Sequence, residues 1–236
     1  MDEVKRKSVI YNHKFRVVFT WIWFLVGAIF VILIFFIIKG FNIEEAMGIL
    51  NNERHLMVYL EFCAVGFMPL LLSIVCKDDP SLYGLNMKKT SLGKSILLSL
   101  IFVAILYTIG YLLKGTIMSY PSHEYNLEIP WNFIYGVASV FTWGPLEMFF
   151  FVWLVVNTDL IFNDKKIIVS KGLIITTIIF AALHIITTDI QNAVYTGIIF
   201  FALGLIYNFS DNIIGPAIAW TMLNGTVWMV SQMFLI

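Results

Sequence analysis

Long apolar segments separated by short polar ones form the dominant pattern along the chain. Each segment is close to the length of about 20 residues that a helix needs to cross the hydrocarbon core of a bilayer. Seven such segments occur, at about residues 17–38, 56–76, 95–113, 133–156, 172–188, 191–208 and 213–236. Because a spanning helix satisfies its own backbone in lipid, the pattern predicts an all-α fold, a polytopic transmembrane helical bundle of about seven spans.

The first apolar segment follows a basic N-terminus, but it is too long for the core of a signal peptide. No small-residue cleavage site follows it, so we expect it to stay in the protein as a signal anchor. The sequence contains no internal repeat and no long linker. We therefore expect residues 1–236 to form a single integral membrane domain, in which residues 1–130 supply the N-terminal helices.

The fourth apolar segment is unusual, because the helical pattern at 131–162 is too long for one straight span. Gly144-Pro145 interrupts it, and proline suits the first turn of a helix better than its interior. The sequence predicts a kink or break there, with a new helix that starts at Pro145. Glu147 would then lie in the first turn, where free N–H groups and the helix dipole favour a carboxylate.

Lysine and arginine divide unequally between the two sides of the predicted bundle. With the N-terminus inside, the inner segments carry Lys5, Arg6, Lys7, Lys14, Arg16, Lys77, Lys88, Lys89, Lys94, Lys165, Lys166 and Lys171. The outer segments carry only Lys39, Arg54 and Lys114. This bias predicts a multi-pass protein of the cell membrane with a cytoplasmic N-terminus and, for seven spans, an external C-terminus.

The composition agrees with a lipid environment. The chain is 60% hydrophobic and 13% charged, against about 25% charged in soluble domains. Its formal net charge is zero, so it lacks the basic surface that marks a nucleic-acid partner. Cys63 and Cys76 lie in or beside an apolar segment and indicate small buried side chains, with no disulfide framework. The oligomeric state stays open.

Three ionisable residues, Glu61, Glu147 and His184, lie inside otherwise apolar segments. An ionisable side chain at membrane depth costs roughly 2.5–3.5 kcal/mol on insertion scales, so such groups indicate function. Glu61 lies near the outer end of its predicted helix, where its carboxylate can reach water. Asn224 taken alone is typical of a polar residue that hydrogen-bonds between helices.

Motif searches narrow the chemistry. The sequence has no His-Glu-x-x-His and therefore no sign of a zinc protease of that type. It has no Gly-x-Ser-x-Gly elbow, no pair of aspartates within the apolar segments and no Cys/His ligand set for a metal. We therefore expect neither a metal nor another cofactor.

An ordered trio of polar residues remains on three late helices. Glu147 occurs in GPLEMFFFVW, His184 in FAALH and Asn224 in WTMLN. Over residues 131–228 the chain resembles the CPBP family, the CAAX-protease and bacteriocin-processing group of membrane proteins. The motifs of that family are Glu-Glu-x-x-x-Arg, Phe-x-x-x-His and His-x-x-x-Asn. Phe180–His184 matches the second motif completely, and Asn224 matches the end of the third.

The sequence departs from these motifs at three positions. Met148 stands where the second glutamate belongs, Val152 replaces the arginine, and Trp220 replaces the histidine of the third motif. The resemblance implies an intramembrane endopeptidase of glutamic type that cleaves a peptide or membrane-protein substrate. In it, Glu147 would be the general base that activates water, His184 its partner, and Asn224 an oxyanion donor.

Two alternatives to the protease remain. The departures at Met148, Val152 and Trp220 are typical of a catalytically inactive homologue, which would act as an immunity factor or as a scaffold that binds membrane peptides. A small-solute or proton-coupled carrier would use Glu61 and Glu147 instead. The missing internal repeat disfavours the carrier, because many carriers are built from repeats.

Overall fold

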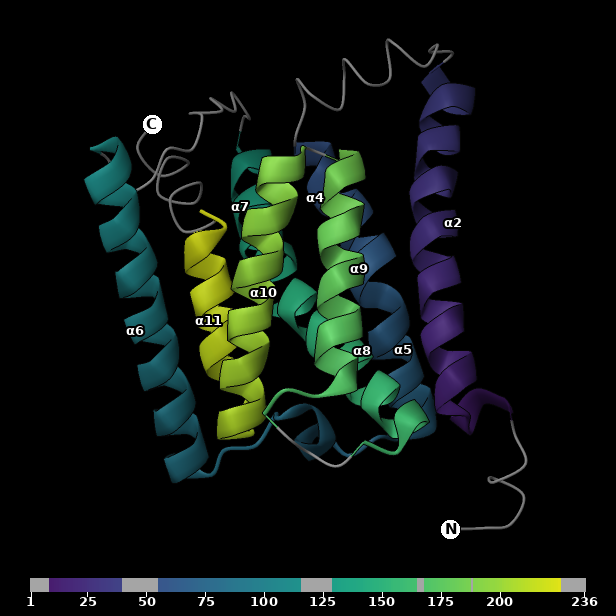
Figure 1. Cartoon of the computed structure of the whole chain (residues 1–236). Helices are drawn as coiled ribbons and strands as arrows, with labels where there is room; N and C mark the ends of the chain where they lie inside the picture. The colour runs from purple at the N-terminus through teal and green to yellow at the C-terminus, as the bar shows by residue number, and fades with distance from the viewer. Residues whose placement is uncertain (1–8, 40–54, 116–128, 165–167, 188, 226–236) are drawn as a thin grey trace.

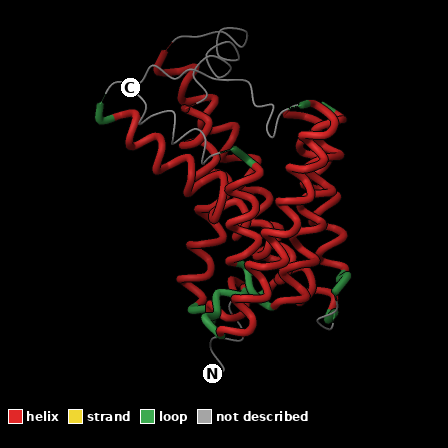
Figure 2. Tube along the Cα trace, turned by 90° about the vertical axis from the view of Figure 1, so that its left-hand side faces the viewer, coloured by secondary structure: helices red, strands yellow, loops and turns green. Residues whose placement is uncertain are grey.

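The computed structural model describes residues 9–39, 55–115, 129–164, 168–187 and 189–225. Over these residues it is entirely helical, with seven helical rods and no strand (Figures 1 and 2). The rods are α2 (His13–Lys39), α4 with α5 (His55–Glu61 and Phe67–Cys76), α6 (Lys89–Lys114), α7 with α8 (Trp131–Phe141 and Glu147–Phe162), α9 (Lys171–Thr187), α10 (Ile190–Ser210) and α11 (Ile214–Leu223). The all-α prediction is thus confirmed.

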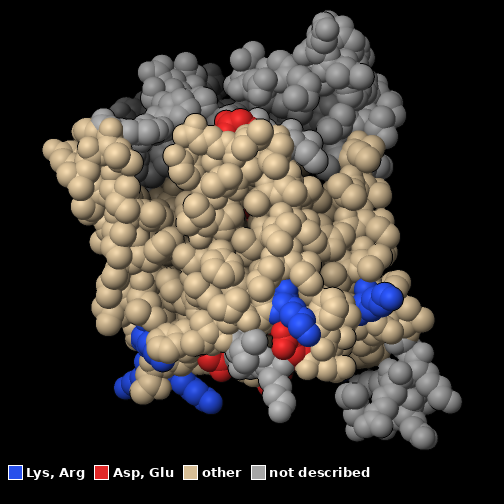
Figure 3. Space-filling view, viewed as in Figure 1, with Lys and Arg blue, Asp and Glu red and all other residues tan. Residues whose placement is uncertain are grey.

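Four of the described helical segments are long and apolar enough to cross a membrane. They are Val58–Cys76, Lys89–Leu113, Trp131–Phe162 and Ile190–Ser210, and shorter apolar helices cover Lys171–Ile185 and Ile214–Leu223. Figure 3 shows a wide band without charged side chains, with Lys and Arg gathered toward the end of the bundle at which α2 begins. The chain therefore has the character of a multi-pass membrane protein. Residues 226–236, with the expected external C-terminus, lie outside the described residues.

Helix α8 forms the centre of the bundle. Every residue from Met148 to Val155 is at most 8% exposed, and α2, α9 and α11 all pack against this helix. Its aromatic side chains join those of its neighbours: Phe150 lies 5.6 Å from Phe180, and Phe151 lies 4.9 Å from Phe200, between ring centroids. Because lipid tails compete equally for apolar groups, such close packing is what holds helices together in a bilayer.

A widened π turn, Thr142–Leu146, joins α7 to α8 at the predicted interruption. The π turn accommodates Pro145, which has no N–H to give to the helix. The backbone nevertheless stays helical, and the N–H of Glu147 donates to the carbonyl oxygen of Thr142. The expected break is therefore an interruption within one continuous helix. Glu147 does not lie at a free helix N-terminus, and the expected stabilisation by unpaired N–H groups is wrong.

A second π turn, which the sequence pattern did not predict, occupies Phe62–Gly66 between α4 and α5. The two π turns pack against each other. The contact is close, because a Cβ atom added to Gly66 would lie 2.1 Å from the side chain of Leu146. A residue larger than glycine would separate the two rods at this point.

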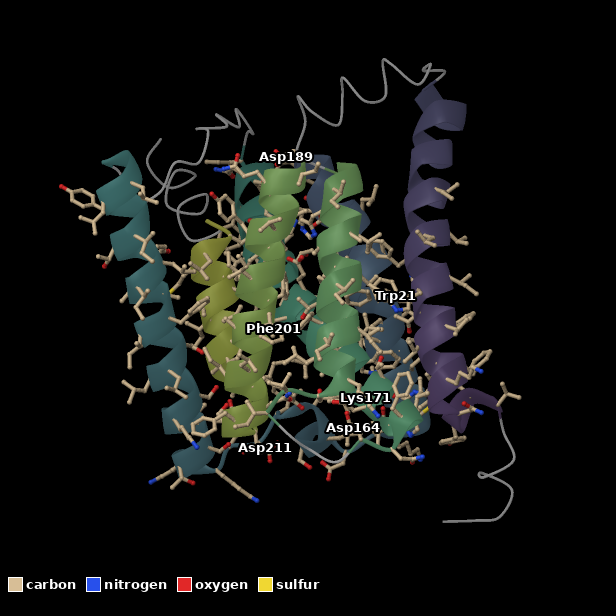
Figure 4. The ribbon with its side chains drawn as sticks, in the orientation of Figure 1. Trp21, Asp164, Lys171, Asp189, Phe201 and Asp211 are labelled. Carbon is tan, nitrogen blue, oxygen red and sulfur yellow. The ribbon has the colours of Figure 1, made fainter. Side chains whose placement is uncertain are left out.

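A buried polar cluster ties α2 to the end of the bundle that carries most charges. The guanidinium of Arg16, 2% exposed, forms an ion pair with Asp78. The hydroxyl of Tyr83 donates to the same carboxylate at 2.5 Å. Burial and this hydrogen bond raise the pKa of Tyr83 to about 12, so the phenol stays protonated and remains a donor. Figure 4 labels Asp164, Lys171 and Asp211 at this end and Asp189 at the opposite one.

Replacement of Arg16 tests this cluster. We expect Arg16→Met to lower the free energy of unfolding by about 3–5 kcal/mol, because it leaves the carboxylate of Asp78 buried without its cation. Thermal unfolding of the purified protein in detergent measures the change. Lys14→Met is the matched control, since Lys14 lies two residues earlier on the same helix and is exposed. Equal melting temperatures for the two variants would contradict a stabilising role of the ion pair.

Candidate functional site

The carboxylate of Glu147 lies between α8 and α11. Its Oε2 accepts a hydrogen bond from the indole N–H of Trp220 at 2.7 Å. Trp220 is itself held in the aromatic core, with its ring 4.6 Å from that of Phe200. The partly buried carboxylate thus has a defined donor, which offsets part of its desolvation cost.

Helices α8 and α9 bring Glu147 and His184 to the same end of their shared interface. The two helices are antiparallel, since Asp159 accepts from the backbone N–H of Gly172 at one end and Phe151 contacts Phe180 at 5.2 Å further along. Residues four apart share a helix face. One turn beyond this aromatic pair, in the same direction, lie Glu147 on α8 and His184 on α9.

The imidazole of His184 has a defined tautomer. Its Nδ1 lies 2.8 Å from the carbonyl oxygen of Phe180, and because a carbonyl can only accept, Nδ1 must carry the proton. In the neutral ring, Nε2 is then the basic nitrogen. The second-motif spacing from Phe180 to His184 therefore has a structural meaning, since one turn of helix supplies the acceptor that orients the histidine.

Asn224 lies immediately after α11, one turn beyond Trp220. Its amide Nδ2 donates to the carbonyl oxygen of Trp143, in the π turn before α8, at 3.1 Å. The helices approach closely here: a Cβ added to Gly144 would lie 2.0 Å from Oγ1 of Thr221. Only glycine permits this contact, which sets α11 against the π turn and so places both Trp220 and Asn224.

Glu61 joins the same region from α4. Its Oε2 accepts a hydrogen bond from the indole N–H of Trp143, and it interacts electrostatically with Glu147. The sequence marked Glu61 as an ionisable residue in an apolar segment, but it linked Glu61 to Glu147 only in the carrier alternative and not in the protease site. Trp143 was missed altogether, because tryptophan is common in apolar helices and nothing in the pattern distinguishes this one.

The three positions that depart from the CPBP motifs have different environments. Met148 and Val152 are both fully buried in the core around α8, so their side chains are part of the packing. Trp220 donates to Glu147, the residue aligned with the first motif. Within the described part of the chain, no three His, Cys, Asp or Glu side chains are grouped as metal ligands.

Comparison with known proteins gives one match. Residues 129–226 match the model of a family described as Type II CAAX prenyl endopeptidase Rce1-like. The matched range is nearly the 131–228 over which the sequence resembles the CPBP group, and the match confirms that resemblance over this segment. Neither a curated protein nor a solved structure matches the chain.

Replacement of Gly144 tests the contact that places the α11 side chains. We expect Gly144→Ala to lower the free energy of unfolding by about 1–3 kcal/mol, the usual cost of an overpacked site, because the new methyl group would overlap Thr221. Chemical or thermal unfolding in detergent measures it, and adding Thr221→Gly should restore much of the loss. Gly93→Ala is the control, since a Cβ there meets nothing within 4 Å. Equal stability of the Gly144 and Gly93 variants would contradict the close approach.

Proposed function

We propose that the chain is an intramembrane endopeptidase of glutamic type, with Glu147 as general base, His184 as its partner and Asn224 as an oxyanion donor. The match to the Rce1-like family supports this proposal for residues 129–226. The observation that carries it is the position of Glu147, whose carboxylate is oriented by Trp220 at the end of the α8–α9 interface that also carries His184. A base held by packing and a hydrogen bond is the preorganisation that hydrolysis requires.

The proposed reaction adds water to a peptide carbonyl. The carboxylate of Glu147 takes a proton from the water, and Nε2 of His184 accepts a hydrogen bond from the same water and orients it. The oxyanion of the tetrahedral intermediate needs a fixed donor. The amide of Asn224 has two N–H groups, of which one donates to Trp143 and the other would face the oxyanion.

The proposed substrate is a peptide or membrane protein with its scissile bond near the membrane surface. The proposed location is the cell membrane, with the N-terminus and the end of the bundle rich in Lys and Arg on the cytoplasmic side. The bias of Lys and Arg among short loops supports this orientation.

Cleavage of membrane-anchored peptides by purified protein tests the catalytic assignment. We expect Glu147→Gln and His184→Ala to abolish cleavage, because the first removes the base and the second leaves the attacking water without the group that orients it. Asn224→Ala should lower kcat by about 10²–10³-fold, the typical effect of losing one oxyanion donor. Lys14→Met serves as the control on an exposed residue away from the site. Cleavage that continues unchanged in Glu147→Gln would overturn the assigned roles.

Peptide binding without hydrolysis is a second candidate, favoured by the motif departures at Met148, Val152 and Trp220. Here Trp220 would hold Glu147 as a structural acceptor. A wild type that cleaves no peptide, yet binds or protects against a membrane-active peptide equally well after Glu147→Gln, would support this candidate over the protease.

Labelling of single cysteines tests the proposed orientation. In a background without Cys63 and Cys76, we expect a cysteine at Lys88 or Lys89 in intact cells to react with a membrane-impermeant maleimide only after the membrane is opened. A cysteine placed within residues 116–128 should react from outside. External labelling at Lys88 would reverse the orientation, because it would place the positively charged end of the bundle outside.

A further inference from the structure

We propose that Glu61 supplies the second carboxyl group of the site, so that Glu61 and Glu147, held by two indole donors on different helices, share one proton as a carboxyl pair. The inference rests on the proposed function and deepens it, because it assigns the acid that must serve the leaving group. It also gives a chemical role to a helix outside the matched range 129–226.

The packing of two rods brings the carboxyl groups to one place. The rods α4–α5 and α7–α8 pack through their π turns, where Gly66 lies against Leu146. Glu61 ends α4 directly before the first π turn, and Glu147 begins α8 directly after the second. The side chain of Trp143 bonds to Glu61, and Glu147 follows one turn later on the same rod.

The hydrogen bonds of the two indole groups to Glu61 and Glu147 belong to one polar network. Trp143 donates its indole N–H to Glu61 and accepts from Asn224 at its carbonyl oxygen. Trp220, four residues before Asn224 and within α11, donates to Glu147. Each carboxyl group therefore has an indole donor, and both donors are fixed by the same contact between the second π turn and α11. Glu61 and Glu147 are therefore held in the same way, each by one indole N–H.

The chain offers no second carboxyl group at the position where the family motif has one. Met148 follows Glu147 and is fully buried in the core, so this position packs against other apolar side chains. A carboxylate there would be desolvated within the core. Glu61 of the opposite rod interacts electrostatically with Glu147 instead, which would restore a pair of carboxyl groups through the packing of the two rods.

Two carboxylates close together in apolar surroundings do not both ionise, because each charge disfavours the other and burial disfavours both. The stable state of the pair at neutral pH therefore holds one proton. In the described residues, the other titratable groups around the pair are Tyr135 of α7, which shares an apolar cluster with Trp143, Cys63 beside Glu61, and His184 of α9.

The pair balances the protons of peptide hydrolysis. When the shared proton resides on Glu61, the ionised Glu147 takes a proton from water as the oxygen bonds to the peptide carbonyl carbon. The protonated Glu61 gives its proton to the amide nitrogen as the carbon–nitrogen bond breaks, which releases an acid and an amine. Transfer of the proton from Glu147 back to Glu61 restores the starting state.

Kinetics of Glu61 variants test the catalytic part. Glu61→Gln keeps an oxygen that can accept from Trp143 but cannot carry the proton, so kcat should fall by about 10²-fold or more. The wild type should show a bell-shaped pH profile, and the residual activity of Glu61→Gln should lose the alkaline limb. Glu61→Asp, which keeps a carboxyl group, should retain the bell shape. Full activity with an unchanged profile in Glu61→Gln, while Glu147→Gln is inactive, would overturn the pair and leave the protease standing.

Infrared titration tests the shared proton without any substrate. The carboxyl stretch of the purified wild type should titrate in two steps, and the upper step should move to lower pH when either Glu61 or Glu147 is replaced by glutamine. The double variant should lose both steps, and Asp79→Asn, at an exposed position, is the control. If the titration curve of the wild type equalled the sum of the curves of the two single variants, the two groups would titrate independently and the proposed pair would be overturned. Cleavage that continues unchanged in Glu147→Gln, together with the shift in the wild type, would overturn the protease and leave the proton-sharing pair standing.

Discussion

The site depends on two hydrogen bonds, each from the indole N–H of a tryptophan to a partly buried carboxylate. A carboxylate within an apolar bundle must find a donor inside the protein, because lipid offers none. Trp143 serves Glu61, and Trp220 serves Glu147. Tryptophan suits this purpose, since its ring packs in the core while its single N–H points at an acceptor. The close contact of Gly144 with Thr221 and the packing of the π turns keep both donors in place.

The same bonds give a physical meaning to the departure from the CPBP motifs at Trp220. A histidine at this position would add a titratable group to the site, whereas the indole adds only a donor. In this chain the donor is directed at Glu147, and the amide of Asn224 is directed at the backbone of Trp143. The α11 residues therefore organise the carboxyl pair, and the oxyanion would rely on the remaining N–H of Asn224. For the proposed protease, the expected consequence is slower catalysis than in a member with complete motifs.

The two ends of the bundle are stabilised differently. At the end rich in Lys and Arg, the Arg16–Asp78 ion pair and the hydroxyl of Tyr83 fix α2 against the turn after α5. Further along, aromatic contacts around Phe180 hold α2, α8, α9 and α10 together. The candidate site lies beyond this aromatic layer, so the layer separates the carboxyl pair from the charged end. This closely packed aromatic layer suits a site whose hydrogen-bond donors must stay in fixed positions.

The sequence by itself determined the helical class, the presence of apolar spans and the interruption at Gly144-Pro145, because segment length and proline chemistry act locally. It also proposed Glu147, His184 and Asn224 as candidate site residues, since polar groups in apolar segments are costly and their order resembles a known family. It could not determine that the interruption is a π turn within a continuous helix. Nor could it join Glu61 to Trp143, 82 residues away, or Glu147 to Trp220, 73 residues away. Those pairs exist only because the helices pack at a particular rotation and depth, and the close contacts at Gly66 and Gly144 that set this packing are visible only in the tertiary structure.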